Sequence, residues 1–122
     1  MLLGFRKGER NVTVFTASDS GSTVEVAAGE SFAVELAENP TTGFRWEFAP
    51  EPGVELVSSS YAVNDGGGAG GGGTRRFEFR PTEAGEFSLR GRLERAWLGE
   101  SSAIQRFEIR VRVSASEQNP QG

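Results

Sequence analysis

The sequence predicts an all-β fold, an antiparallel β-sandwich of seven or eight strands, on three observations. Apolar residues alternate with charged residues at a period of two in several runs, which is the pattern of half-buried antiparallel strands. Residues that favour turns, chiefly Gly, Pro, Asp and Ser, separate these runs. No stretch has a helical period long enough to compete with the strands. Short strands at this spacing are typical of a sandwich.

The clearest strands each combine one apolar face with one charged face. In chain order they are Phe32–Leu36, Phe44–Phe48, Phe77–Phe79, Phe87–Leu93 and Phe107–Val113. A further strand is expected to end near Tyr61. Two weaker runs with β-branched residues, Asn11–Thr16 and Ser22–Val26, precede them.

The length of 122 residues fits a single domain with one hydrophobic core. We expect residues 1–10 to form an N-terminal extension, residues 11–113 the domain, and residues 114–122 a polar tail. The segment Met1–Lys7 has no apolar run long enough for a signal sequence or a membrane span. We therefore expect a soluble protein that is a monomer when free. Its compartment, and whether it was trimmed from an exported precursor, stay open.

The composition argues against an enzyme and against two classes of partner. The formal net charge is -4, whereas nucleic acids and anionic membranes are bound mainly through excess positive charge. The chain has no histidine and no cysteine, so it lacks the commonest general base and metal ligand. We expect no catalytic residue, metal or cofactor. Three carboxylates lie in or near loops, but their spacing demands no acid pair, and solvated charges are commoner: Glu38, Asp65 and Glu100.

Alternating strand directions gather three unusual loops at one end of the predicted sandwich. If consecutive strands reverse from residue 31 onward, the connections after Leu36, Tyr61 and Leu93 share one end. The other end then holds only short Pro/Gly turns, at Pro50–Gly53 and Pro81–Gly85. Sandwich folds commonly place recognition on such a loop cluster.

The first of these loops, Asn39-Pro40-Thr41-Thr42-Gly43, is expected to be compact and stiff. Proline fixes φ early in the turn, Gly43 can supply a positive φ at the exit, and Asn39 can bond to its own backbone. An ordinary strand connector would look the same. Two exposed hydroxyl residues on a stiff tip nevertheless suit entry into a narrow cleft at little entropic cost.

The second loop contains seven glycines in the eight positions 66–73. A phosphate-binding loop would need a Lys-Ser/Thr pair and a following helix, but Thr74-Arg75-Arg76 leads into a strand. A flexible linker is the usual meaning of such a segment. Alternatively the exposed segment, lacking Cβ atoms, lies directly against another protein's main chain.

The third loop carries Trp97 outside the register of any strand, whereas Trp46 falls on an alternating face and is expected in the core. A Trp beside an Arg, here Arg95, is typical of an interface anchor. Trp97 folded back over the sandwich end is the alternative.

Taken in order, the three loops resemble the chagasin family of cysteine-peptidase inhibitors. The family pattern is Asn-Pro-Thr-Thr-Gly and an aromatic, then Gly-x-Gly-Gly, then Arg-Pro-Trp. Its counterparts here are Asn39-Pro40-Thr41-Thr42-Gly43-Phe44, then Gly70-Gly71-Gly72-Gly73, then Arg95-Ala96-Trp97. Ala96 departs from the pattern by replacing the expected proline, which removes a φ constraint. The resemblance spans about residues 11 to 113.

The resemblance implies an immunoglobulin-like fold and reversible, non-covalent inhibition of papain-like cysteine peptidases. Thr41 and Thr42 would enter the catalytic cleft near the peptidase's nucleophilic cysteine. The glycines up to Gly73 would lie beside peptidase main chain, and Trp97 would pack on the primed side of the cleft with Arg95 near it. An immunoglobulin-like adhesion or scaffold module, binding another protein or a carbohydrate through the same loops, is the alternative function.

Overall fold

The structure is a computed structural model that describes residues 12–63, 72–95 and 97–115 of the chain. Its strands and short 3-10 turns confirm the all-β expectation, with eight strands in the described residues. The strands are β1 (Thr13–Thr16), β2 (Thr23–Ala27), β3 (Phe32–Glu38), β4 (Phe44–Phe48), β5 (Val54–Val63), β6 (Gly73–Pro81), β7 (Gly85–Arg95) and β8 (Gln105–Ser114). The 3-10 turns are η1 (Ala17–Asp19), η2 (Pro40–Thr42) and η3 (Gly99–Ser102).

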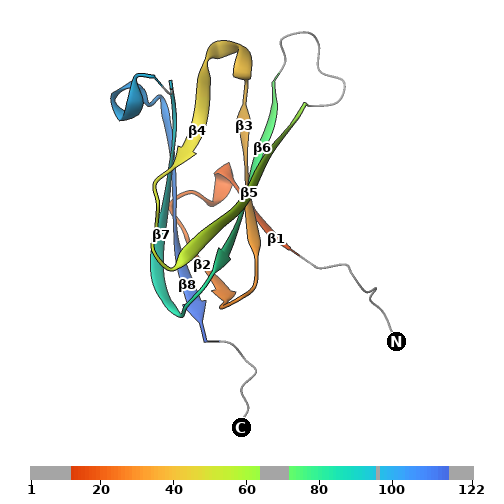
Figure 1. Cartoon of the computed structure of the whole chain (residues 1–122), viewed down its shortest axis with the longest axis vertical. Helices are drawn as coiled ribbons and strands as arrows, with labels where there is room; N and C mark the ends of the chain where they lie inside the picture. Colours follow the sequence, from red (N-terminus) through yellow and green to blue (C-terminus); the bar gives the residue numbers. More distant parts are fainter. Residues whose placement is uncertain (1–11, 64–71, 96, 116–122) are drawn as a thin grey trace, which may run out of the picture.

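The strands form two four-stranded sheets packed face to face (Figure 1). The first sheet has the order β1-β3-β6-β5 and the second the order β2-β8-β7-β4. Four strand pairs are antiparallel, as the alternating pattern predicts. At most connections, consecutive strands belong to different sheets, so the chain passes repeatedly from one sheet of the sandwich to the other.

Two strand pairs depart from the fully antiparallel expectation. β1 pairs with β3, and β2 pairs with β8, in parallel. The cause is a reversal of direction at every connection, so that strands whose numbers are both odd or both even run the same way. β1 and β2 enter their sheets beside a strand of matching direction, whereas every other neighbour in the two sheets runs the opposite way.

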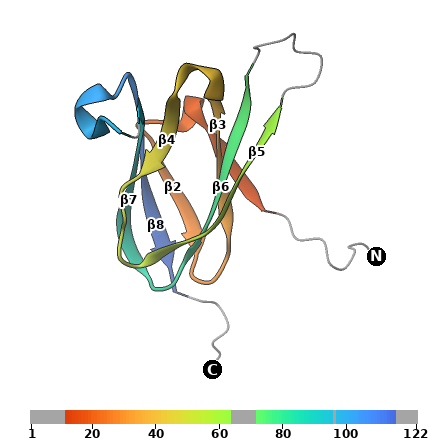
Figure 2. The same ribbon diagram turned by 45° about the horizontal axis from the view of Figure 1, so that its top comes forward.

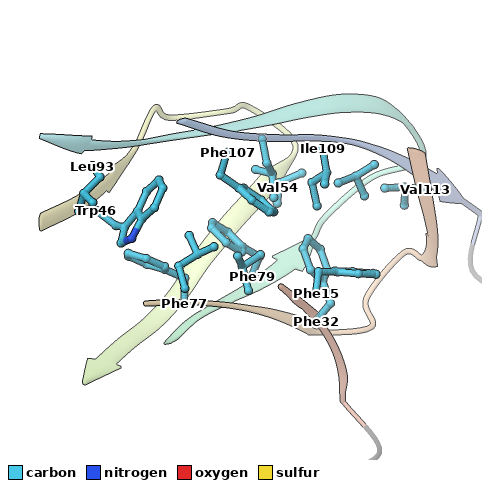
Figure 3. Packing of buried hydrophobic residues seen from close by; sticks show 14 residues of the cluster. Phe15, Phe32, Trp46, Val54, Phe77, Phe79, Leu93, Phe107, Ile109 and Val113 are labelled. Carbon is cyan, nitrogen blue, oxygen red and sulfur yellow. The ribbon is translucent and has the colours of Figure 1, made fainter. Parts of the chain in front are cut away.

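The core lies between the sheets and is built from the inward face of each alternating run (Figure 3). Phe48 packs edge-on against the rings of Phe77, Phe79 and Phe107, with centroids 4.8, 5.3 and 6.0 Å apart. Trp46 is buried, as predicted. Aromatic rings in this geometry add to the free energy gained from the burial of apolar area. The core thus fixes the sandwich from which the loops project.

From β3 onward, strand direction places three connections at one end, which we call the loop end. There β3, β5 and β7 finish and β4, β6 and β8 begin (Figure 1). Figure 2, in which this end is turned forward, shows η2 between the η3 turn and the neighbouring ends of β5 and β6. The turns between β2 and β3, β4 and β5, and β6 and β7 lie at the opposite end. The predicted segregation of loops is confirmed.

Candidate functional site

The first loop is a single 3-10 turn closed by hydrogen bonds at both sides. Asn39 caps it: its Oδ1 accepts from the Thr41 N–H at 3.1 Å, and its carbonyl accepts from the Thr42 N–H at 3.1 Å. The Gly43 N–H donates to the Pro40 carbonyl at 3.1 Å, and Gly43 has a φ of 85°. The roles expected of Asn39 and Gly43 are both confirmed.

The two threonines of this loop are exposed, and their hydroxyl groups are held. The Thr41 Oγ1 donates to Asn39 Oδ1 at 2.7 Å, and the Thr42 Oγ1 donates to the Asn39 carbonyl at 2.8 Å. The Thr42 Oγ1 also accepts from the Phe44 N–H at 3.2 Å. Because these bonds fix each side chain locally, the tip presents a set shape and loses little rotamer entropy on contact with a partner.

Trp97 of the third loop is exposed and lies against the first loop. The residue is 69% exposed, yet a Cβ added to Gly43 would lie 3.1 Å from the Trp97 Cη2 atom. The indole therefore leans over Gly43 and leaves most of its surface accessible. The structure brings the first and third loops into contact, and it supports an exposed Trp97 over one packed down on the sandwich.

Arg95 lies beneath this contact and does not point freely to solvent. Its guanidinium stacks over the Phe44 ring, with the Arg95 Cζ atom 4.7 Å from the ring centroid, a favourable cation–π geometry. The Arg95 Nε atom is buried without a hydrogen-bond partner among the residues described. The Arg95 N–H donates to Ser102 Oγ at 2.9 Å, and its carbonyl accepts from the Leu98 N–H at 2.9 Å. Arg95 thus joins the base of the first loop to the third.

The glycine segment is described only at its end, since Gly70 and Gly71 lie outside the described residues, as does Ala96. The expectation of an exposed segment is wrong for Gly73, which is buried as the first residue of β6 between β3 and β5. A Cβ there would overlap the Ala62 carbonyl oxygen and lie 2.6 Å from the Tyr61 Oη. Gly73 is required for close packing of neighbouring strands.

Glu38 is the main feature that sequence reasoning missed. It was expected to be a solvated loop charge, but it is 3% exposed. The side chain follows Phe32, Val34 and Leu36 on the inward face of β3, so the period of two contained the signal. Glu38 accepts hydrogen bonds from Arg75 and from the Trp46 N–H. Asp65 lies outside the described residues, and the side chain of Glu100 is not described.

A groove of about 530 Å3 opens at the loop end between the two sheets. The first loop forms one wall, the end of the glycine segment another, and the return into β8 a third. The lining residues are Ala37, Glu38, Asn39, Thr42, Phe44, Gly72, Gly73, Leu93, Ile104 and Gln105. Ile104, which lines the groove, and Leu98, in the third loop, are exposed apolar residues. They are candidate contacts that sequence reasoning missed. The available signal was that both residues, like Trp97, are apolar and fall outside the alternating pattern of the strands.

None of the described residues forms a helix long and apolar enough to cross a membrane. None belongs to a group of three or more His, Cys, Asp or Glu residues placed to hold a metal ion.

A rigid sandwich that gathers held loops and an exposed Trp at one end has the architecture of a loop-based binding module. Comparison with known proteins identifies the family to which this binding module belongs. Residues 25–111 match the family model described as Chagasin family peptidase inhibitor I42. The chain belongs to the chagasin family of peptidase inhibitors. This confirms the resemblance carried by the three motifs, and with it the expectation of an inhibitor and not an enzyme.

One sequence relative agrees with this assignment, and two solved structures share the fold. Chagasin of Trypanosoma cruzi is 31% identical over 105 residues, which cover 81% of this chain and 96% of chagasin. The fold is similar to that of the cysteine protease inhibitor EhICP2 from Entamoeba histolytica, with a TM-score of 0.75 and 17% identity over 84% of this chain and 95% of that one. It is also similar to amebosin in solution, with a TM-score of 0.72 and 24% identity over 86% of this chain and 100% of that one.

Proposed function

We propose that this protein is a reversible, non-covalent inhibitor of papain-like cysteine peptidases that fills the active-site cleft with the three loops of its loop end. The observation that carries the proposal is the contact between the first and third loops. Thr41, Thr42 and Trp97 are all exposed at this end, and the Trp97 ring rests on Gly43. A wedge of this kind blocks a cleft by its shape.

The first loop is the part proposed to enter the cleft. Thr41 and Thr42 lead, near the nucleophilic cysteine of the peptidase, while Asn39, Pro40 and Gly43 hold the turn and Phe44 anchors its exit. Since the hydroxyl groups bond within the loop, little conformational entropy is lost on entry. Occlusion at this tip is steric and forms no covalent bond with the peptidase.

The other two loops are proposed to flank the first. Gly70, Gly71 and Gly72 lie beside peptidase main chain, as an extended substrate would, and buried Gly73 anchors that segment in the sheet. Trp97 packs on the primed side of the cleft, and Arg95 supports it through its stack on Phe44. Large, exposed aromatics beside Arg residues are frequent hot spots of binding energy. Residues 11–113 would constitute the inhibitor domain, acting as a monomer.

A titration against a panel of peptidases tests this function. Papain-like enzymes should lose activity in proportion to added protein and reach full inhibition near equimolar protein. Unrelated serine and metallopeptidases should keep their activity. Activity should return on dilution, and the mass of both proteins should be unchanged. Full activity of several papain-like enzymes at micromolar excess would overturn the proposal, and binding on a glycan array would then favour the adhesion alternative.

A further inference from the structure

We propose that Glu38 is a positioning residue that sets inhibitory affinity by fixing the first loop relative to the neighbouring ends of β5 and β6. The inference rests on the proposed function, because affinity is measured against a papain-like peptidase. Glu38 would act through the loop and would not touch the peptidase. Its two carboxylate oxygens are held by different elements of the fold.

Each oxygen of the Glu38 carboxylate has its own partner. Oε1 accepts from the Trp46 backbone N–H at 2.9 Å. Oε2 accepts from the Arg75 Nη2 at 2.9 Å and the Arg75 Nε at 3.2 Å. The Glu38 side chain is 0% exposed, and that of Arg75 is 18% exposed. A buried carboxylate satisfied on both oxygens has strong, directional bonds, because little water competes for them.

The bond to Trp46 spans the base of the first loop. That loop lies between Glu38, the last residue of β3, and Phe44, the first of β4. β3 and β4 belong to different sheets, so no ladder of backbone hydrogen bonds fixes the distance between the two stems. Two bonds join them directly: Glu38 to the Trp46 N–H, and the Trp46 Nε1–H to the Ala37 carbonyl at 2.9 Å.

The bonds to Arg75 tie the same residue to the stems of the glycine segment. Arg75 follows Gly73 by two positions on β6, and its guanidinium lies over the Tyr61 ring, with the Arg75 Cζ atom 5.3 Å from the centroid. Tyr61, near the end of β5, donates from its hydroxyl group to the Glu38 carbonyl at 3.3 Å. Glu38 therefore connects four strand ends, two from each of two loops proposed to bind the peptidase.

Removing the charge of Glu38 should loosen this connection without removing the core. In Glu38→Gln, one amide oxygen remains as an acceptor, but the amide –NH2 group faces a second donor, either Arg75 or the Trp46 N–H. The stems of the first loop then lose one fixed point, and binding must order the loop again.

The experiment compares Glu38→Gln with Glu35→Gln. Glu35 pairs with Arg76 at 2.7 Å across the same two strands, β3 and β6, but both side chains are 34% exposed. This pair lies on the face of the sheet opposite to the one that carries Glu38 and Arg75. At a temperature where all variants are folded, Glu38→Gln should raise the inhibition constant for papain about tenfold or more. Glu35→Gln should change it by less than about twofold. Amide exchange at Thr41–Phe44 should accelerate only in Glu38→Gln.

A lower melting temperature with an unchanged inhibition constant and unchanged exchange would overturn the inference, because Glu38 would then be merely structural. If Glu38→Gln does not fold, Arg75→Lys replaces it, since lysine keeps the charge but not the paired geometry. A several-fold rise in the inhibition constant is expected there, and no change overturns the inference. Wild-type protein that inhibits no papain-like enzyme defeats the proposed function alone, because the exchange measurement needs no peptidase.

Discussion

Gly43 shows how the conformation of one residue determines a contact between two loops. Its φ of 85° lies in the left-handed region, and the absence of a Cβ lets the Trp97 ring approach. Either requirement alone would favour glycine. Together they make Gly43 the point at which the turn of the first loop and the position of Trp97 depend on each other.

Gly43→Ala should therefore lower both stability and affinity. The left-handed backbone costs an alanine about 1 kcal/mol of unfolding free energy, and the new methyl group displaces the Trp97 ring. Gly29→Ala is a matched control, because Gly29 has a φ of 86° with nothing within 4 Å of an added Cβ. It belongs to the turn between β2 and β3, which lies at the opposite end. Both variants should melt at similarly reduced temperatures, but only Gly43→Ala should raise the inhibition constant. Equal affinities for the two would contradict the role given to the contact.

Trp97→Ala separates binding from folding at the same site. Because Trp97 is 69% exposed, its removal should change the unfolding free energy by less than about 0.5 kcal/mol. The inhibition constant should rise roughly 30-fold, the equivalent of about 2 kcal/mol at a hot spot. Val14→Ala, which truncates an exposed residue of β1, should leave inhibition as it is. An unchanged constant for Trp97→Ala with an intact fold would remove Trp97 from the site.

At the scale of elements, β3 illustrates what a period of two predicts and what it leaves undetermined. The alternation through Phe32, Val34 and Leu36 correctly predicts the buried face. The next inward position is Glu38, which the chemistry of a carboxylate suggests is solvated. Its burial depends on Arg75, a residue 37 positions further along the chain. The local pattern reveals which way a side chain points, but it does not reveal which distant partner offsets the free-energy cost of burying a charge.

The start of β6 gives a prediction about the glycine segment. Gly73→Ala should lower the unfolding free energy by about 2 kcal/mol or more, because the methyl group would overlap the Ala62 carbonyl and the Tyr61 hydroxyl. Chemical denaturation measures this directly. A variant with wild-type stability would contradict the packing described between β5 and β6. The sequence alone does not distinguish Gly73 from the glycines before it, because identical residues in a run can have different surroundings.

For the whole molecule, the core and the loop end should respond independently to substitution. Ile109 is fully buried in β8, and Ile109→Val should lower the unfolding free energy by about 1 kcal/mol. The inhibition constant should not change under conditions where the variant is folded, because the strands still end at the same places. A parallel loss of affinity would mean that packing in the middle of the sandwich reaches the loops.

Much of this architecture could be predicted because strand direction is a simple alternation. Strand β4 begins and ends at Phe44 and Phe48, as expected, and the three loops share one end. The same alternation, continued back to β1 and β2, leads to the two parallel pairs. These were not predicted because the choice of sheet for each N-terminal strand depends on packing between sheets, which no local pattern of residues records.

The direction of β8 has a practical consequence. This strand begins at the loop end and finishes at Ser114 on the far side of the sandwich, and ten residues of strand extend roughly 30 Å. A bead, a fluorophore or a second domain joined through this side would stand that far from an engaged peptidase. If the loop end binds the peptidase as proposed, the protein can be immobilised through the C-terminal end of β8 and still capture its target at the opposite end.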